Sequence, residues 1–135
     1  MSASGKSETP VPTIRWMIVA AGLAGATGVA FAAAAAHGAG LESLGSASAM
    51  LLAHAPVLLI LGFGGAARLR FGGACAALVV AGLVLFAGDL GLRALAGFPL
   101  FASAAPIGGS LLIVSWLAIA LAAVFARRWH NKHIR

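Results

Sequence analysis

The feature that most constrains this chain is its division into four long stretches without a charged side chain. No Asp, Glu, Lys or Arg occurs in residues 16–41, 43–67, 71–88 and 94–126. A helix that crosses a hydrocarbon core about 30 Å thick needs roughly 20 consecutive apolar residues, and each stretch can hold one, the third being the shortest. The sequence therefore predicts an all-α fold in which four helices span a membrane.

The overall composition argues against a soluble globular domain. Hydrophobic residues make up 61% of the 135 residues and charged residues only 9%, whereas a small soluble domain needs a polar shell. Helices are expected, and not barrel strands, because the apolar stretches are continuous and do not alternate. The net charge of +6 comes from short basic clusters between these stretches, which is typical of membrane topology signals. We therefore expect the lipid bilayer as a partner, and no nucleic acid.

The apolar stretches predict an integral membrane four-helix bundle over residues 15–128. Its helices are expected at residues 16–36, 47–67, 71–95 and 106–126. Residues 1–14 are rich in Ser and Pro and are expected to form a disordered tail, and residues 129–135 a basic C-terminal tail suited to an anionic membrane surface. A cleaved secretory signal is an alternative for the first helix, although its apolar run exceeds the roughly 7–15 residues of such a core.

The distribution of basic residues predicts the orientation of these helices. With four spans, eight of the nine Lys and Arg fall on one side of the membrane and Arg93 alone on the other. The eight are Lys6, Arg15, Arg68, Arg70, Arg127, Arg128, Lys132 and Arg135. Because Lys and Arg are retained on the cytoplasmic side, we predict that both termini and the middle loop are cytoplasmic.

Polar residues near the opposite side form a candidate outer polar cluster, made of His37, His54, Asp89 and Arg93. Asp89 and Arg93 are four positions apart, so they share one helical face. We expect them to form an ion pair at the membrane boundary, with a functional polar site as the alternative. His54 lies well inside the second predicted helix, where a polar side chain should face protein. We therefore expect it to point toward the third helix, near Asp89.

Small residues recur at helix-contact spacing in three of the predicted helices. The first helix has Gly22, Gly25 and Gly28 at three-residue spacing, and Ala21 and Gly25 at four. The other stripes are Gly73, Ala77 and Ala81, and Ala118, Ala122 and Ala126. Small residues let a neighbouring helix approach closely, which is a main source of helix association in lipid. For the first helix, Ala-rich filler without a contact role is the alternative.

Three tracts resemble a known family. LFAGDLGLRAL, then APIGG, then SW are similar to the LFSGSLY, TPIGG and GW motifs of the YgdD-like family of small bacterial inner-membrane proteins, a domain of unknown function. The matching positions are Leu85, Phe86, Gly88, Pro106, Gly108, Gly109 and Trp116, and His37 and His54 match two family histidines. Ala87 and Asp89 replace the two motif serines, so any role of those hydroxyls is changed or lost here. The resemblance covers residues 28–116 and implies a multi-pass protein of the cell inner membrane without an assigned activity.

The motifs present do not identify a reaction. Ser, His and Asp occur without a nucleophile elbow or a metalloprotease motif, so we assign no catalytic or metal-binding residue and expect no cofactor. The small-residue faces favour a structural, assembly or accessory component of a membrane complex, bound to a membrane-protein partner or to a second copy. A small transporter, channel or lipid-handling protein is the alternative, although the polar residues lie toward one side of the membrane. A third possibility is a haem site that uses His37 and His54, or a zinc site that uses the same histidines with Asp89. The spacing of these residues matches no known haem or zinc motif.

Overall fold

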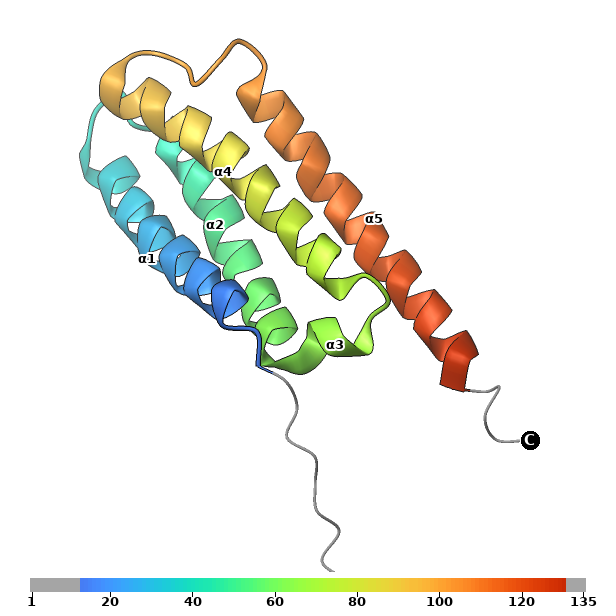
Figure 1. The fold of residues 1–135 in the computed structure, drawn as a ribbon. Coiled ribbons are helices and arrows are strands. Elements are labelled where there is room, and N and C mark those ends of the chain that lie inside the picture. The colour runs from blue at the N-terminus through green and yellow to red at the C-terminus, as the bar shows by residue number, and fades with distance from the viewer. Residues whose placement is uncertain (1–12, 131–135) are drawn as a thin grey trace, which may run out of the picture.

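The computed structural model describes residues 13–130, and within that range the chain forms only helices and the turns between them (Figure 1). The helices are α1 (Arg15–His37), α2 (Ser43–Ile60), α3 (Ala66–Arg68), α4 (Gly72–Ala96) and α5 (Ala104–His130), with a π-helical segment, η1 (Leu61–Gly65), between α2 and α3. Four helical segments in this range are long and apolar enough to cross a membrane: α1, α2 through α3, α4 and α5. The prediction of an all-α fold with four such helices is confirmed. The disordered tail predicted before residue 13 and the basic tail after residue 130 lie outside the described residues.

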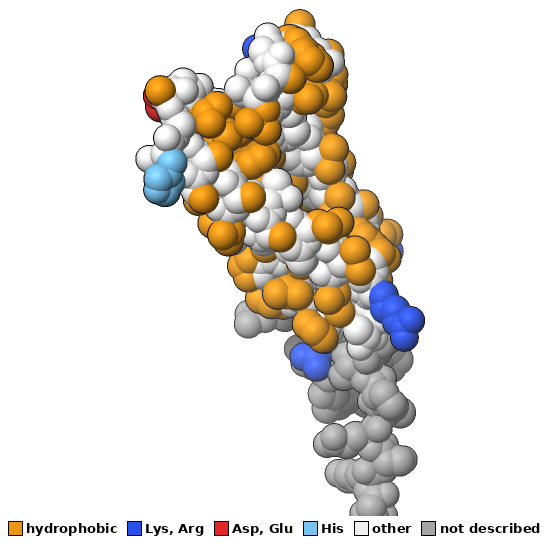
Figure 2. All heavy atoms as spheres, turned by 90° about the vertical axis from the view of Figure 1, so that its left-hand side faces the viewer, with side chains coloured by type: hydrophobic (Ala, Val, Ile, Leu, Met, Phe, Trp, Pro, Cys, Tyr) orange, Lys and Arg blue, Asp and Glu red, His pale blue; other side chains and the backbone are white. Residues whose placement is uncertain are grey.

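The long helices run alternately in opposite directions because short connections join them (Figure 1). α2 packs against both α1 and α4, and α5 packs against α4. The start of α1, the α3 turn and the start of α4 therefore share one end, the basic end, which carries Arg15, Arg68 and Arg70. The connections at residues 38–42 and 97–103 lie at the opposite end, here called the loop end. Figure 2 shows hydrophobic side chains over the middle of one face, with basic side chains toward its lower part.

The contact face of α1 includes only some of the small residues predicted for it. The side of α1 that is buried carries Met17, Ala21, Ala24 and Gly28. Of the predicted small residues, Ala21 is buried, and of the three glycines only Gly28 is in contact: a Cβ atom added there would lie 2.8 Å from Cγ of Leu52, whereas one added at Gly22 or Gly25 would meet nothing within 4 Å. The hydroxyl of Ser48 on α2 donates a 2.7 Å hydrogen bond to the Gly28 carbonyl oxygen. The α1–α2 contact is thus made at one glycine of the three.

The second helix begins earlier than predicted and is interrupted. It starts at Ser43, four positions before residue 47, because Leu44 and Ala47 are fully buried and burial outweighs the low helix propensity of Ser and Gly. Its helical geometry breaks in η1, where Gly64 has a φ of +103° that favours glycine. The carbonyl oxygen of Gly62 accepts a 2.8 Å hydrogen bond from the N–H of Ile14, so the irregular turn fastens the residue that precedes α1.

Candidate functional site

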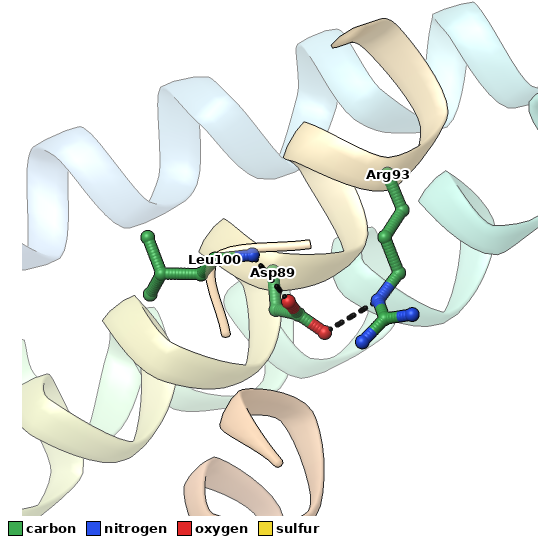
Figure 3. Close-up of polar contacts among 3 residues, drawn as sticks. All are labelled: Asp89, Arg93 and Leu100. Atoms are coloured by element: carbon green, nitrogen blue, oxygen red, sulfur yellow. Dashed lines mark hydrogen bonds and ion pairs between the residues drawn. The ribbon is translucent and has the colours of Figure 1, made fainter. Parts of the chain in front are cut away.

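Asp89 is the one charged side chain of the described residues that is buried, with 0% of its surface exposed. Its Oδ2 accepts a 2.7 Å hydrogen bond from Nε of Arg93, one turn further along α4, and its Oδ1 accepts a 2.8 Å hydrogen bond from the backbone N–H of Leu100 (Figure 3). Arg93 itself is about half exposed. The predicted ion pair is present, and the carboxylate also binds the connection between α4 and α5.

The second partner of Asp89 gives the residue a structural role that the sequence did not reveal. A buried carboxylate is tolerated only when hydrogen bonds or an opposite charge replace its lost hydration, and here both oxygens are bonded. Leu100 donates through its backbone N–H, which nearly every residue type has. The identity of the residue at position 100 therefore gives no sign of this contact in the sequence. Asp89 therefore joins the last turns of α4 to the connection at residues 97–103.

His54 is also buried, with 4% of its surface exposed. Nε1 of Trp116 on α5 donates a 3.0 Å hydrogen bond to its Nε2, and its Nδ1 lies 2.8 Å from the carbonyl oxygen of Met50. The two rings are tilted by 59°, with centroids 5.9 Å apart. His54 thus connects α2 to α5 across 62 positions of sequence.

These two contacts define the protonation of the His54 ring. An indole N–H can only donate, so Nε2 of His54 must accept and cannot carry a proton. The proton then lies on Nδ1, which donates to the Met50 carbonyl oxygen at 2.8 Å. The hydrogen-bond network therefore holds a neutral imidazole in its Nδ1–H tautomer.

The predicted outer polar cluster divides into separate contacts. Asp89 and Arg93 are paired, whereas His54 bonds Trp116 in place of the expected partner Asp89, whose two oxygens are already taken by Arg93 and Leu100. His37 is exposed at the end of α1, and its Nδ1 lies 2.8 Å from the Ala33 carbonyl oxygen of its own helix. Among the side chains that the structure describes, no three from His, Cys, Asp and Glu are grouped closely enough to hold a metal ion.

The motif positions on α4 and α5 form a close contact between the two helices. A Cβ atom added at Gly108 would collide with the backbone nitrogen of Phe86 and would lie 2.8 Å from the carbonyl oxygen of Gly82. Gly109, one position later, is only loosely confined, because its added Cβ would be 3.8 Å from the Phe86 ring. Leu85 and Gly88 are half-buried, and Pro106 lies exposed in the first turn of α5, where proline is tolerated. The α4–α5 approach therefore depends on Gly108 in particular.

An apolar groove lies between α1 and α4 and is also lined by α2. Its volume is about 330 Å³, and its lining includes Leu23 and Thr27 of α1, Leu58 of α2, and Val80 and Val84 of α4. Toward the loop end Phe31 of α1 packs against Gly91 of α4, since a Cβ added to that glycine would lie 3.0 Å from the phenyl ring. No charged residue lines the groove.

Fold and composition place the chain among small all-helical proteins with four helices able to cross a membrane. It belongs to the family described as "Protein of unknown function (DUF423)", whose sequence model matches residues 24–109. That match includes His54, Asp89 and Gly108 and ends before Trp116. The expected membership in an uncharacterised family is confirmed, while the finer resemblance to YgdD-like proteins stays a prediction. No solved structure matches the chain.

Proposed function

We propose that this protein is a multi-pass protein of the cell inner membrane that acts as a structural, assembly or accessory component of a membrane complex. The observation that carries the proposal is the position of Gly73, Ala77 and Ala81, which are all exposed on α4. Large apolar side chains on the surface of a membrane protein are explained by lipid alone. Small residues repeated at four-residue spacing, in contrast, are typical of a surface against which another helix packs.

The exposed small residues continue into the groove. Val80 and Val84 follow Ala77 and Ala81 by three positions, which places all four on one side of α4, and both valines line the space between α4 and α1. We name the surface formed by Gly73, Ala77 and Ala81 the α4 docking face. A transmembrane helix of a partner protein is the occupant that its spacing favours.

The hydrogen bonding of the buried polar side chains favours an accessory role over a transport role. Ser48, His54, Asp89 and Ser115 are the buried polar or charged residues of the described chain, and none of the buried side-chain nitrogen and oxygen atoms there lacks a partner. A transport pathway needs polar groups that remain available to a substrate along the membrane normal. Here these groups bond to the protein itself.

The proposal includes the orientation of the helices across the membrane. Arg15, Arg68 and Arg70 gather at the basic end, whereas Arg93 lies in the last turns of α4 near the loop end. By the positive-inside rule the basic end faces the cytoplasm, so that the connection at residues 97–103 faces outward.

The test is purification from native membranes in mild detergent, with mass spectrometry of the bound proteins and a visible absorption spectrum. We compare the wild type with Ala77→Trp, which fills the α4 docking face, and with Leu121→Trp, a matched change at a position of α5 that is 58% exposed. A stoichiometric membrane-protein partner should accompany the wild type and Leu121→Trp and be lost from Ala77→Trp. Purification without any partner, or a haem absorption band, would overturn the accessory role.

A further inference from the structure

We propose that Arg93 binds the phosphate group of an anionic phospholipid in the leaflet at the loop end, and that Asp89 is the positioning residue for this contact. The inference rests on the proposed membrane location but not on the accessory role. Arg93 has 46% of its side-chain surface exposed and is bonded to Asp89 through Nε. A guanidinium carries five N–H donors, so the donors on its two Nη atoms remain for an acceptor outside the chain.

The depth of Arg93 matches that of a lipid headgroup. It precedes the end of α4 at Ala96 by three residues, which is about 4.5 Å along a helix that rises about 1.5 Å per residue. Phosphate oxygens are the abundant acceptors at this boundary, and a planar guanidinium can bind a phosphate through two parallel hydrogen bonds. An arginine held at this depth therefore faces a chemically fitting group.

The surroundings favour a lipid phosphate over free phosphate. The connection that Asp89 holds through Leu100 exposes three large apolar side chains, with 55% of Phe98, 44% of Leu100 and 44% of Phe101 accessible. Exposed apolar side chains of this kind are favourable at the membrane interface. A phospholipid supplies both a phosphate for the cation and apolar chains for these residues, whereas inorganic phosphate supplies only the first.

Asp89 has two opposing effects on such a site, and they can be separated. Its negative charge weakens the attraction between Arg93 and any anion, while its hydrogen bond to Nε holds the guanidinium in one orientation (Figure 3). Asp89→Asn removes the charge and keeps the size of the side chain, but its amide has a single acceptor oxygen and cannot hold both Nε of Arg93 and the N–H of Leu100. If charge alone mattered, this variant would bind the lipid better. If positioning matters, as proposed here, it binds the lipid less well.

The experiment uses the full chain in liposomes that contain phosphatidylglycerol with a photoreactive headgroup, and peptide mapping locates the cross-links. The wild type should be cross-linked at residues 97–103 and also near the basic end, which serves as an internal control. Arg93→Gln should lower the cross-linking at residues 97–103 by about tenfold or more, since a hydrogen bond to a charged group contributes about 1.5–3 kcal/mol. Asp89→Asn should lower it as well, and Arg93→Lys, which keeps the charge, should give an intermediate yield. Cross-linking at the basic end should not change in any variant.

Any one of four results would overturn the inference. Undiminished cross-linking at residues 97–103 in Arg93→Gln, or an increase in Asp89→Asn, would show that Arg93 is not a positioned phosphate ligand. Loss of the wild-type cross-links upon addition of inorganic phosphate would identify free phosphate as the ligand. Absence of cross-links at both ends would refute the membrane location itself, and so the proposed function. Far-UV circular dichroism of each variant checks that the helices are retained, and Arg93→Lys keeps the test valid if Arg93→Gln unfolds.

Discussion

Replacing Gly108 by alanine tests the contact between α4 and α5 most directly. The new methyl group would collide with the backbone nitrogen of Phe86 and would lie 2.8 Å from the Gly82 carbonyl oxygen and 2.9 Å from Cα of Phe86, where ordinary contacts begin at 3.4 Å. All three are backbone atoms, so no side-chain rotation can make room. The two helices must move apart by about 0.5–1 Å, which removes about a quarter to a half of the dispersion energy of each contact that they share.

The expected loss of stability follows from this separation. Overpacking of a close-packed contact costs about 1–3 kcal/mol, and we expect the upper value because α4 is the main neighbour of α5. Alanine recovers about 1 kcal/mol of helix propensity relative to glycine, which leaves a net loss of about 2 kcal/mol. Gly109→Ala recovers the same propensity without a collision, since its nearest atom would be 3.8 Å away. The two adjacent substitutions should thus differ by about 3 kcal/mol, with opposite signs.

The assay is reversible unfolding in mixed detergent micelles, followed by far-UV circular dichroism for the wild type and both variants. Gly108→Ala should unfold at a lower fraction of denaturing detergent in the micelles than the wild type. Gly109→Ala should unfold at an equal or higher fraction than the wild type. If the two variants unfold together, the backbone approach at Gly108 does not determine how α4 and α5 pack, and the reasoning is wrong.

Three further predictions follow from the orientation and the two polar contacts. Reporter domains fused after α3 and at the C-terminus should give cytoplasmic signals and one inserted at residues 97–103 an external signal; an external C-terminus would contradict the orientation. Arg93→Ala should lower stability in detergent by about 1–2 kcal/mol because it leaves the buried Asp89 carboxylate without its cation. The double variant with Asp89→Ala should lose less than the sum of the single losses, and simple addition would show that the pair is not coupled. A double-mutant cycle of His54→Leu and Trp116→Phe should give a coupling energy of about 1 kcal/mol, and a value near zero would mean that the hydrogen bond contributes nothing.

The features that were predictable from the sequence are local along the chain. The number of helices follows from the length of uncharged apolar runs, and α1 and α4 begin and end within one residue of the predicted limits. The Asp89–Arg93 pair follows from a spacing of four residues within one helix. Neither inference requires knowledge of which helices are neighbours.

Some local features were missed because the deciding interaction is distant. The added first turn of α2 depends on burial of Leu44, and the break at Gly64 coincides with a backbone hydrogen bond from Ile14, far away in sequence. The uncharged apolar run alone predicts a later start and does not place a break at Gly64. A glycine-rich segment, with Gly62, Gly64 and Gly65, was the one available signal for the irregular turn.

The rotation of each helix about its own axis was decided only by the tertiary structure. In a soluble protein the apolar stripe of a helix marks its buried side, but lipid and protein interior are both apolar, so the two sides of a membrane helix carry nearly the same residues. Spacing alone therefore could not show that Gly28 faces a neighbour while Gly73, Ala77 and Ala81 face outward. The same ambiguity concealed the partner of His54: its depth in the second helix called for a protein contact, but only the packing of the helices placed Trp116 there.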